Sequence, residues 1–219
     1  KEIRNRITSV QSTMQITSAM KMVSAAKLKK AQDAITAMRP YAEKLTELLQ
    51  SVSATLDGDA GGQYTSQREV NKVLIVAVTS NRGLCGGFNN NIIKRTGVLI
   101  NEDYKDANVH VLSVGKKIRD VYKRTEYNYA NERIENMEDV YADLRFEVVA
   151  QLAEEIIQQF NNKSFDKIVL VYNRFINAAT QFVETEQFLP IVPTATEGEN
   201  TGDYLFEPSK IEIVEDLIP

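Results

Sequence analysis

Apolar residues recur at helical spacing along the first 56 residues, and the pattern breaks only at 57–62, where the sequence reads Asp-Gly-Asp-Ala-Gly-Gly. At about 1.5 Å per residue such a helix is roughly 80 Å long, far more than a globular domain can cover. Pro40 lies inside it and predicts a local bend without an end, because proline removes one backbone hydrogen bond. The pattern therefore predicts a very long N-terminal helix that needs partners outside its own domain.

The spacing of apolar residues within this helix indicates two kinds of surface. From Leu28 to Leu56 the intervals alternate between three and four residues, which is typical of a coiled-coil seam. The predicted seam positions are Leu28, Ile35, Met38, Leu45, Leu49 and Val52. Between 16 and 26 the apolar residues spread around the helix, so this zone is predicted to contact something besides a partner helix. Its apolar members include Ile16, Met20, Met22, Val23 and Ala26.

Beyond the break, the pattern changes to that of an α/β domain. The run 73–78 is apolar without interruption, as expected for a parallel strand that is buried on both faces. We predict helices at 89–102, 117–123 and 137–161, strands at 109–114 and 168–172, and an antiparallel strand at 181–188. This alternation predicts a Rossmann-like domain with a mainly parallel sheet and right-handed crossovers.

These patterns divide the chain into four segments. We expect a long helix over 1–56, a linker over 57–71 and an α/β domain over 72–208. The dipeptide Pro208-Ser209 is typical of a helix start, so 209–219 is expected to begin another helix, which is cut off at Pro219.

Composition limits the chemistry that the chain can carry. A single cysteine, Cys85, and a single histidine, His110, leave few ligands and nucleophiles for metal sites or catalytic triads. No stretch approaches the roughly 18 to 20 apolar residues of a membrane-spanning helix, so any membrane role is expected to be peripheral. We therefore predict no catalytic residue, no cofactor site and no metal site.

Charge is distributed unevenly along the sequence. Up to Arg39 the net charge is about +6, although the whole chain carries −4. A basic arm on an acidic body predicts an acidic partner, and nucleic acid is one candidate. However, no aromatic residues interleave with Lys27, Lys29 and Lys30 to stack on bases. A nucleic-acid-binding coiled-coil adaptor therefore stays as a minor alternative.

The loop 81–89 is the main argument for an enzyme. It is rich in glycine and lies between a predicted strand and a predicted helix, where backbone amides attract phosphate. Its glycine spacing fits neither the dinucleotide fingerprint nor the P-loop, and the next strand ends at 113–115 without the acidic residue that would hold a ribose. A structural tight turn with Cys85 as a packed residue is favoured. A nucleotide-dependent α/β enzyme with a coiled-coil dimerisation helix is the alternative.

Two groups of carboxylates and the histidine also have structural interpretations. Charged runs on helices are usually solvated faces, so we predict no catalytic role for the carboxylates. They are Glu132, Glu135, Glu138, Asp139, Glu154 and Glu155. His110 begins an apolar strand and is predicted to be a structural histidine with satisfied hydrogen bonds.

Two segments on either side of the predicted helix break resemble one family. The segment 16–28 reads Ile-Thr-Ser-Ala-Met-Lys-Met-Val-Ser-Ala-Ala-Lys-Leu, and 80–89 reads Ser-Asn-Arg-Gly-Leu-Cys-Gly-Gly-Phe-Asn. Both are similar to signatures of the gamma subunit of bacterial-type F-type ATP synthases. Arg39-Pro40-Tyr41 and the segment 203–208, Asp-Tyr-Leu-Phe-Glu-Pro, also resemble that family. The resemblance thus spans nearly the whole chain.

The resemblance implies a non-catalytic rotor subunit of the central stalk, which serves ATP synthesis and proton transport by coupling c-ring rotation to conformational change in the catalytic beta subunits. The implied partners are three alpha and three beta subunits, the epsilon subunit and the c-ring, with no nucleic acid and no cofactor. The implied contacts with the alpha/beta ring are Ile16, Met20, Lys21, Met22, Val23, Ala26, Lys27 and Lys30. The implied contacts on the c-ring and epsilon side are Tyr204, Leu205, Phe206 and Glu207.

The resemblance also sets two expectations about the surroundings of the chain. It implies a peripheral place on the cytoplasmic face of the bacterial plasma (inner) membrane, reached through the complex. In this family the N-terminal helix pairs antiparallel with a C-terminal helix, and that partner helix is expected to be missing after Pro219. The long helix is therefore expected to be half of an antiparallel coiled coil.

Overall fold

The computed structural model describes residues 1–55, 64–130, 137, 139–141 and 144–192, and of 49–55 and 139 it describes only the backbone. The chain divides into two compact units, Lys1–Leu49 and Gln50–Pro219. The predicted boundaries near 57 and 209 lie outside the described residues. The predicted division into four segments therefore stays a prediction.

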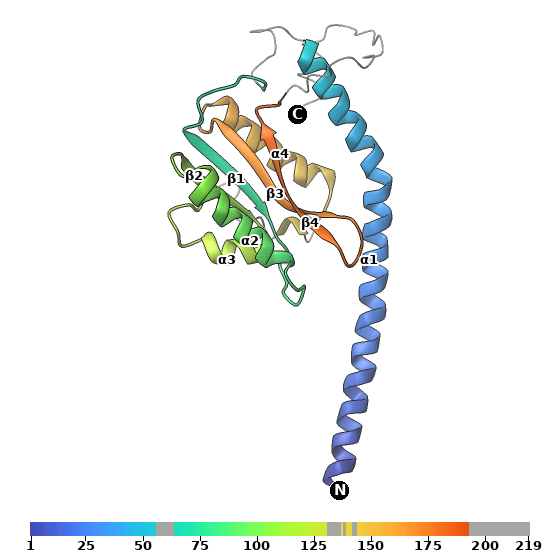
Figure 1. Cartoon of the computed structure of the whole chain (residues 1–219). Coiled ribbons are helices and arrows are strands. Elements are labelled where there is room, and N and C mark those ends of the chain that lie inside the picture. Colours follow the sequence, from blue (N-terminus) through green and yellow to red (C-terminus); the bar gives the residue numbers. More distant parts are fainter. Residues whose placement is uncertain (56–63, 131–136, 138, 142–143, 193–219) are drawn as a thin grey trace. The chain divides into compact units, whose positions relative to one another are not determined.

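The long helix expected from the sequence is α1, Glu2–Thr55, a single α-helix of 54 residues, drawn in blue in Figure 1. It continues through Pro40, so the proline does not end the helix, as predicted. In the described part of the chain, no helix is both long enough and apolar enough to cross a membrane.

The second unit contains the α/β domain. Its sheet has the strand order β2-β1-β3-β4, in which β1 pairs parallel with β2 and β3, and β4 pairs antiparallel with β3. The predicted Rossmann-like, mainly parallel sheet is thereby confirmed. Its elements are β1 (Lys72–Val78), α2 (Phe88–Val98), the π-helical turn η2 (Leu99–Asp103), β2 (Asn108–Val114), α3 (Lys116–Tyr122), the 3-10 turn η3 (Asp139–Tyr141), α4 (Phe146–Asn161), β3 (Lys167–Phe175) and β4 (Gln181–Leu189).

Helices cover both faces of the sheet, with α2 and α3 on one face and α4 on the other (Figure 1). Successive residues of a strand point to opposite faces, so Val73 and Ile75 pack with α2 and α3, whereas Leu74 and Val76 pack with α4. Phe160 of α4 is fully buried in the second of these layers. The uninterrupted apolar run of β1 thus supplies both cores at once.

The predicted helix at 137–161 is wrong over its first third. α4 begins only at Phe146, because Arg145 is extended with φ −112° and ψ 154°. The preceding η3 turn is held against the end of β1, since Val140 is buried and the Tyr141 hydroxyl donates a hydrogen bond of 2.7 Å to the Thr79 carbonyl. These tertiary contacts stop the helical spacing from becoming one continuous helix.

The β3–β4 hairpin extends beyond the predicted strand 168–172, because pairing continues to Phe175 opposite Gln181. On its outer part the Tyr172 hydroxyl donates to Glu186 Oε2 at 2.8 Å, and Arg174 pairs with Glu184 at 3.0 Å. Burial, then the hydrogen bond to Glu186 and its charge, raise the pKa of Tyr172 to about 12.

Candidate functional site

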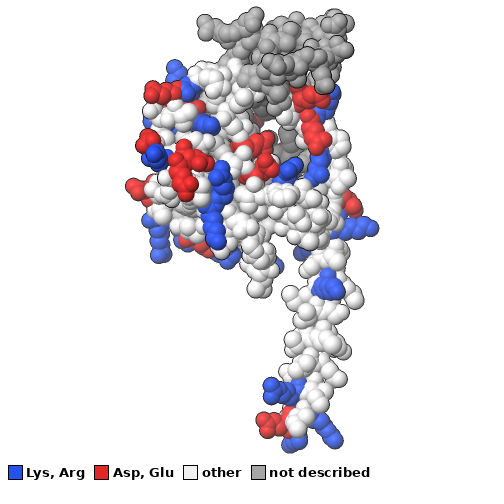
Figure 2. Space-filling view, viewed as in Figure 1, with Lys and Arg blue, Asp and Glu red and all other residues white. Residues whose placement is uncertain are grey.

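The exposed surface of α1 is the first candidate site. Figure 2 shows long stretches of uncharged surface on this helix, with Lys and Arg side chains spaced between them. The side chains of Ile16, Met20, Met22 and Val23 are 57% to 70% exposed. Apolar side chains gain free energy when a partner removes them from water, so a helix of this kind is suited to association.

One face of α1 collects most of the predicted contact residues. Ile16, Met20, Val23, Lys27 and Lys30 follow one another at intervals of three and four residues, so at 3.6 residues per turn they lie in one stripe. We call these five residues the contact stripe. Its first three members are apolar and its last two are basic. The stripe can therefore offer dispersion contacts at one end and charge at the other.

The predicted seam runs on a different side of the helix at this level. Extended back from Leu28 in steps of seven residues, the seam passes through Lys21 and Met14, and these positions lie roughly 140° around the helix from the middle of the contact stripe. Lys21 is therefore a seam position, whereas Met22 and Ala26 lie on a third side. These separate sides would allow contacts with a partner helix and with other subunits, which stay predictions.

A polar seam residue hides its hydroxyl. Thr17 falls on the seam between Met14 and Lys21, and its Oγ1 donates a hydrogen bond of 2.8 Å to the Thr13 carbonyl of the preceding turn. Thr13 does the same toward Ser9 at 3.0 Å. A threonine whose hydroxyl bonds the preceding turn can present its methyl group to a partner. The seam can therefore make apolar contacts at Thr17 although the residue is polar.

The two lysines of the contact stripe form no ion pair with other described residues of the chain. Lys27 and Lys30 are both exposed. Further along the helix Lys44 pairs with Glu47 at 2.7 Å. Charge attraction is weak in water and stronger once a partner excludes solvent, so these lysines suit an acidic partner surface.

Some predicted site residues cannot be placed. Leu28 and Met38 of the seam are exposed and Ile35 and Leu45 are half-buried, whereas the side chains of Leu49 and Val52 lie outside the description. The predicted c-ring and epsilon contacts also lie outside the described residues. They are Tyr204, Leu205, Phe206 and Glu207. The roles of all these residues stay predictions.

The glycine-rich loop is filled by a side chain of its own helix. Asn89 is buried, and its Oδ1 accepts the Ser80 backbone N–H at 2.9 Å. Its Nδ2 donates to the Arg82 carbonyl and to Cys85 Sγ, both at 3.1 Å. The space that a phosphate would need between loop and helix is therefore used internally. Sequence reasoning missed this role, although an asparagine in a first helical turn is a familiar sign of loop capping.

The start of α3 is closed in the same way. The Lys116 N–H donates to Asn81 Oδ1 at 2.8 Å, and the Ile118 N–H donates to Thr79 Oγ1 at 3.0 Å. Gly115 has φ +100°, and a Cβ there would lie 2.1 Å from the Thr79 carbonyl oxygen. Backbone amides at the start of a helix can bind phosphate. Here two of them donate to residues that follow β1 instead.

Two side-chain predictions need correction. Cys85 is exposed and not packed, because the loop turns outward next to Gly86, whose φ is +58°. His110 packs edge-on to Phe165 at 5.6 Å between ring centroids, but its buried Nδ1 has no hydrogen-bond partner within the described part of the chain. The aromatic surroundings that bury the ring offer no acceptor or donor at that atom.

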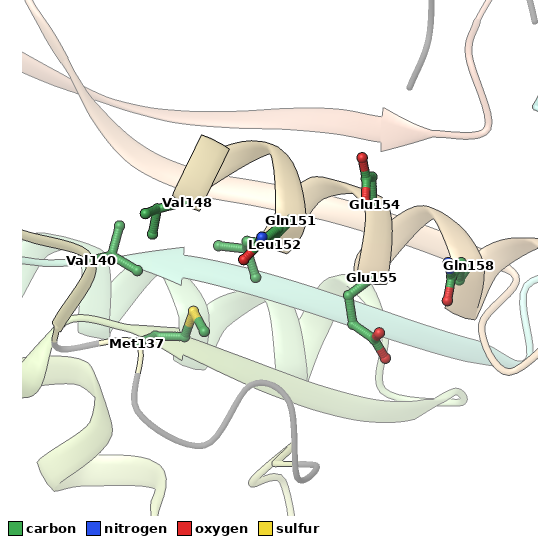
Figure 3. A pocket seen from close by; sticks show the side chains of 8 residues that line it. All are labelled: Met137, Val140, Val148, Gln151, Leu152, Glu154, Glu155 and Gln158. Carbon is green, nitrogen blue, oxygen red and sulfur yellow. The ribbon is translucent and has the colours of Figure 1, made fainter. Parts of the chain in front are cut away.

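The two neighbouring carboxylates of α4, for which no catalytic role is predicted, do not converge on one site. Glu154 and Glu155 line a hollow of about 410 Å³ that α4 forms with Met137 and Val140, but they point to opposite sides of the helix (Figure 3). Glu155 is buried and accepts a hydrogen bond of 3.0 Å from Gln159. Glu132, Glu135 and Glu138 lie outside the described residues, as does the side chain of Asp139. Nor do the described residues contain a group of three or more possible metal ligands.

An α/β domain together with an exposed helix of 54 residues is typical of one class of protein, a subunit of a larger assembly. A family model described as ATP synthase matches residues 1–219. The ATP synthase gamma chain of Flavobacterium psychrophilum is 61% identical over 220 residues, covering 100% of this chain and 75% of that one. The gamma chain of Christiangramia forsetii is 58% identical over 219 residues with the same coverage.

Two solved structures have the same fold. The central stalk and c-ring structure of the Tetrahymena thermophila mitochondrial ATP synthase matches with a TM-score of 0.60 and 23% identity, over 93% of this chain and 85% of that chain. The rotor of the Euglena gracilis mitochondrial ATP synthase matches with a TM-score of 0.50 and 21% identity, over 98% and 73%.

The chain belongs to the ATP synthase gamma chain family. Its role is that of a non-catalytic rotor subunit of an ATP synthase, and it serves ATP synthesis and proton transport as a rotating part. The nucleotide-dependent enzyme is thereby set aside, in line with the closed loop at Asn89.

Proposed function

We propose that α1 transmits rotation of a c-ring to the catalytic subunits by pressing its contact stripe against a ring of three alpha and three beta subunits. The observation that carries this is the stripe itself, because it exposes Ile16, Met20 and Val23 to water in a chain of the gamma family. Full burial of each such side chain contributes about 1.5–3 kcal/mol. Three such side chains together can bind a partner surface and still release it at each step of rotation.

The chemistry of the stripe suits a moving contact. Isoleucine, valine and methionine make non-directional contacts, and methionine is flexible enough to fill partner surfaces of different shape. Lys27 and Lys30 add attraction to acidic groups without fixing one geometry, because an ammonium is a point charge. Met22, Ala26 and Lys21 would face other parts of the ring or the partner helix as the rotor turns.

The remaining assignments follow from the family and the sequence. The seam would pair antiparallel with another helix, and the α/β domain would form the foot that binds the epsilon subunit and the c-ring, with 204–207 on that side. The assembly would lie on the cytoplasmic face of the bacterial inner membrane. Segments 1–56, 57–71, 72–208 and 209–219 would be the helix, linker, foot and next helix of this rotor.

Site-specific photo-crosslinking in the assembled ATP synthase tests the contact stripe. A benzophenone side chain at Val23 or Lys30 should yield products with alpha or beta subunits. The control is Lys94, an exposed lysine on α2 of the α/β domain. Equal yields from Lys94 and Lys30, or no product from Val23, would contradict the assignment of this face.

A coupling assay gives the functional counterpart. Val23→Ser should lower proton-driven ATP synthesis by removing a contact that transmits torque. Lys94→Gln, at an exposed position of α2, should leave synthesis within about twofold, because surface substitutions away from contacts change little. If Val23→Ser left ATP synthesis and its dependence on the proton gradient unchanged, the stripe would not be the transmitting surface.

A further inference from the structure

A hollow at the outer edge of the sheet is unrelated to the contact stripe. It has a volume of about 420 Å³ and lies beside β2 and α3. The residues that matter here are Ser113 of β2, Arg119 and Lys123 of α3, Arg124 and Asn128. We call this hollow the edge pocket.

The fold builds the edge pocket by adding a short segment to the sheet. The Val111 N–H donates to the Tyr127 carbonyl at 2.6 Å, and the Tyr129 N–H donates to the Val111 carbonyl at 3.0 Å. Between α3 and this segment the chain turns at Thr125, whose Oγ1 donates to the Tyr122 carbonyl at 2.8 Å. The turn brings Arg124 and the last turn of α3 beside the edge of β2. Backbone pairing therefore fixes the walls of the pocket.

The wall on the α3 side is strongly basic. Residues 116–124 contain five cations and one carboxylate, Asp120. Asp120 lies 3.0 Å from Lys123 and 3.8 Å from Lys116. The hydrogen bond from Lys123 and the charges of the lysines around it lower the pKa of Asp120, against a weaker opposing effect of burial. Three of these cations, Arg119, Lys123 and Arg124, line the edge pocket, so the described wall on this side is basic.

Ser113 is the second and independent observation. Ser113 is only 8% exposed, and its buried Oγ has no hydrogen-bond partner among the residues that the structure describes. A buried hydroxyl without a partner costs about 1–3 kcal/mol, so an unsatisfied one in a native fold requires an explanation. An anionic oxygen in the edge pocket would be an acceptor for this hydroxyl and a counter-charge for the cations. Neither function is needed for a rotor.

We propose that the edge pocket binds a phosphate group. Lys123 and Arg124 would neutralise its charge, the Ser113 hydroxyl would donate a hydrogen bond to one oxygen, and the Asn128 amide could donate another. Arg119 has a further interaction within the chain, so the site does not require it to be free. Guanidinium and ammonium groups with a hydroxyl are the donor set that proteins use for phosphate. The volume exceeds that of a bare phosphate and leaves room for a phosphorylated molecule.

Three probes distinguish the source of the phosphate. The full gamma chain is titrated with inorganic phosphate, with ATP, and with phosphatidylglycerol vesicles against phosphatidylcholine vesicles. Binding of either of the first two identifies a free phosphate compound as the ligand. Binding of phosphatidylglycerol vesicles alone identifies a lipid headgroup. All should weaken as salt is added, because the contact is largely electrostatic.

Matched variants decide whether the pocket is responsible. The double variant Lys123→Gln, Arg124→Gln should weaken binding at least tenfold. Ser113→Ala should weaken binding at least threefold. It should not lower the melting temperature, because the Ser113 hydroxyl forms no hydrogen bond with the described residues. The control is Lys94→Gln with Lys105→Gln, two exposed cations outside the pocket, which should change binding less than twofold. Equal loss in the control pair, or no binding of any probe, would overturn the proposal. Neither result would bear on the proposed role of the contact stripe.

Discussion

Asn89 is the residue on which the glycine-rich loop depends. Its side chain bonds the Ser80 amide at 2.9 Å, the Arg82 carbonyl at 3.1 Å and Cys85 Sγ at 3.1 Å. The loop therefore closes onto the first turn of α2 through one buried amide. Asn89→Ala removes these three hydrogen bonds, together with the one between Asn89 Nδ2 and the Ser80 hydroxyl at 3.0 Å. It adds none, because alanine has no polar side-chain atom and its small side chain leaves the backbone unchanged.

The expected loss of stability can be worked out from these bonds. The bonds to Ser80 and Arg82 contribute about 0.5–1.5 kcal/mol each, and the Ser80 N–H left without its acceptor adds to the loss. Together they predict a decrease of about 3 kcal/mol in the free energy of unfolding. For a domain of this size that corresponds to a fall of about 6–12 °C in melting temperature.

Urea unfolding of the full chain, followed by circular dichroism, measures this change. Asn90→Ala is the matched control, since Asn90 is the exposed neighbour on the same helix and should shift stability by less than about 0.5 kcal/mol. Amide exchange at 82–87 should also become faster in Asn89→Ala. If Asn89→Ala destabilised the chain no more than Asn90→Ala, the loop would be held by something other than this side chain.

Three further outcomes are expected. Gly115→Ala should destabilise the domain by about 3 kcal/mol or more, because Gly115 has a positive φ and a Cβ there would clash with Thr79. Gly97→Ala in α2, where a Cβ would meet open space, should stabilise the domain by about 0.5–1 kcal/mol. Melting temperatures of the two variants check both values, and equal shifts would contradict the steric argument. Tyr172 ionises at a higher pH in the folded than in the unfolded chain, so the stability that it contributes is complete below about pH 10 and is lost as pH rises toward 12. The urea midpoint should therefore fall less steeply between about pH 10 and 12 in Tyr172→Phe than in the unchanged protein. Parallel plots of urea midpoint against pH would refute this linkage. Phe160→Ala should lower the free energy of unfolding by about 3–5 kcal/mol, because it leaves a cavity in the core. Phe146→Ala, at an exposed position of the same helix, should lower it by less than about 0.5 kcal/mol. Similar unfolding midpoints for the two variants would show that Phe160 is not a core residue.

Local patterns were sufficient for most of the elements. The unbroken spacing up to residue 56 predicted α1, because apolar residues three and four apart fix a helix without any tertiary information. The continuous apolar run of β1 predicted a strand with helices on both faces, and the structure has them. The segments 16–28 and 80–89 were sufficient for the family, since both are long and specific.

Contacts between distant residues decided the rest. The start of α4 depends on Tyr141 reaching Thr79, which is far away in sequence and invisible to helical periodicity. The loop 81–89 could be read from the sequence as a turn, but only the fold brings Asn89 inside it and turns Cys85 outward. The edge pocket likewise exists only because Tyr127 and Tyr129 pair with Val111.

For this protein the sequence by itself determined the long helix, its seam spacing, the α/β class and the family, because each rests on periodicity or on contiguous motifs. Only the tertiary structure decided which amides near the glycine-rich loop are already bonded, and that Ser113 and Arg124 line one pocket. The physical reason is that a hydrogen bond or a charge pair depends on positions in space. Spacing along the chain fixes such positions within one helix or strand, and not between them.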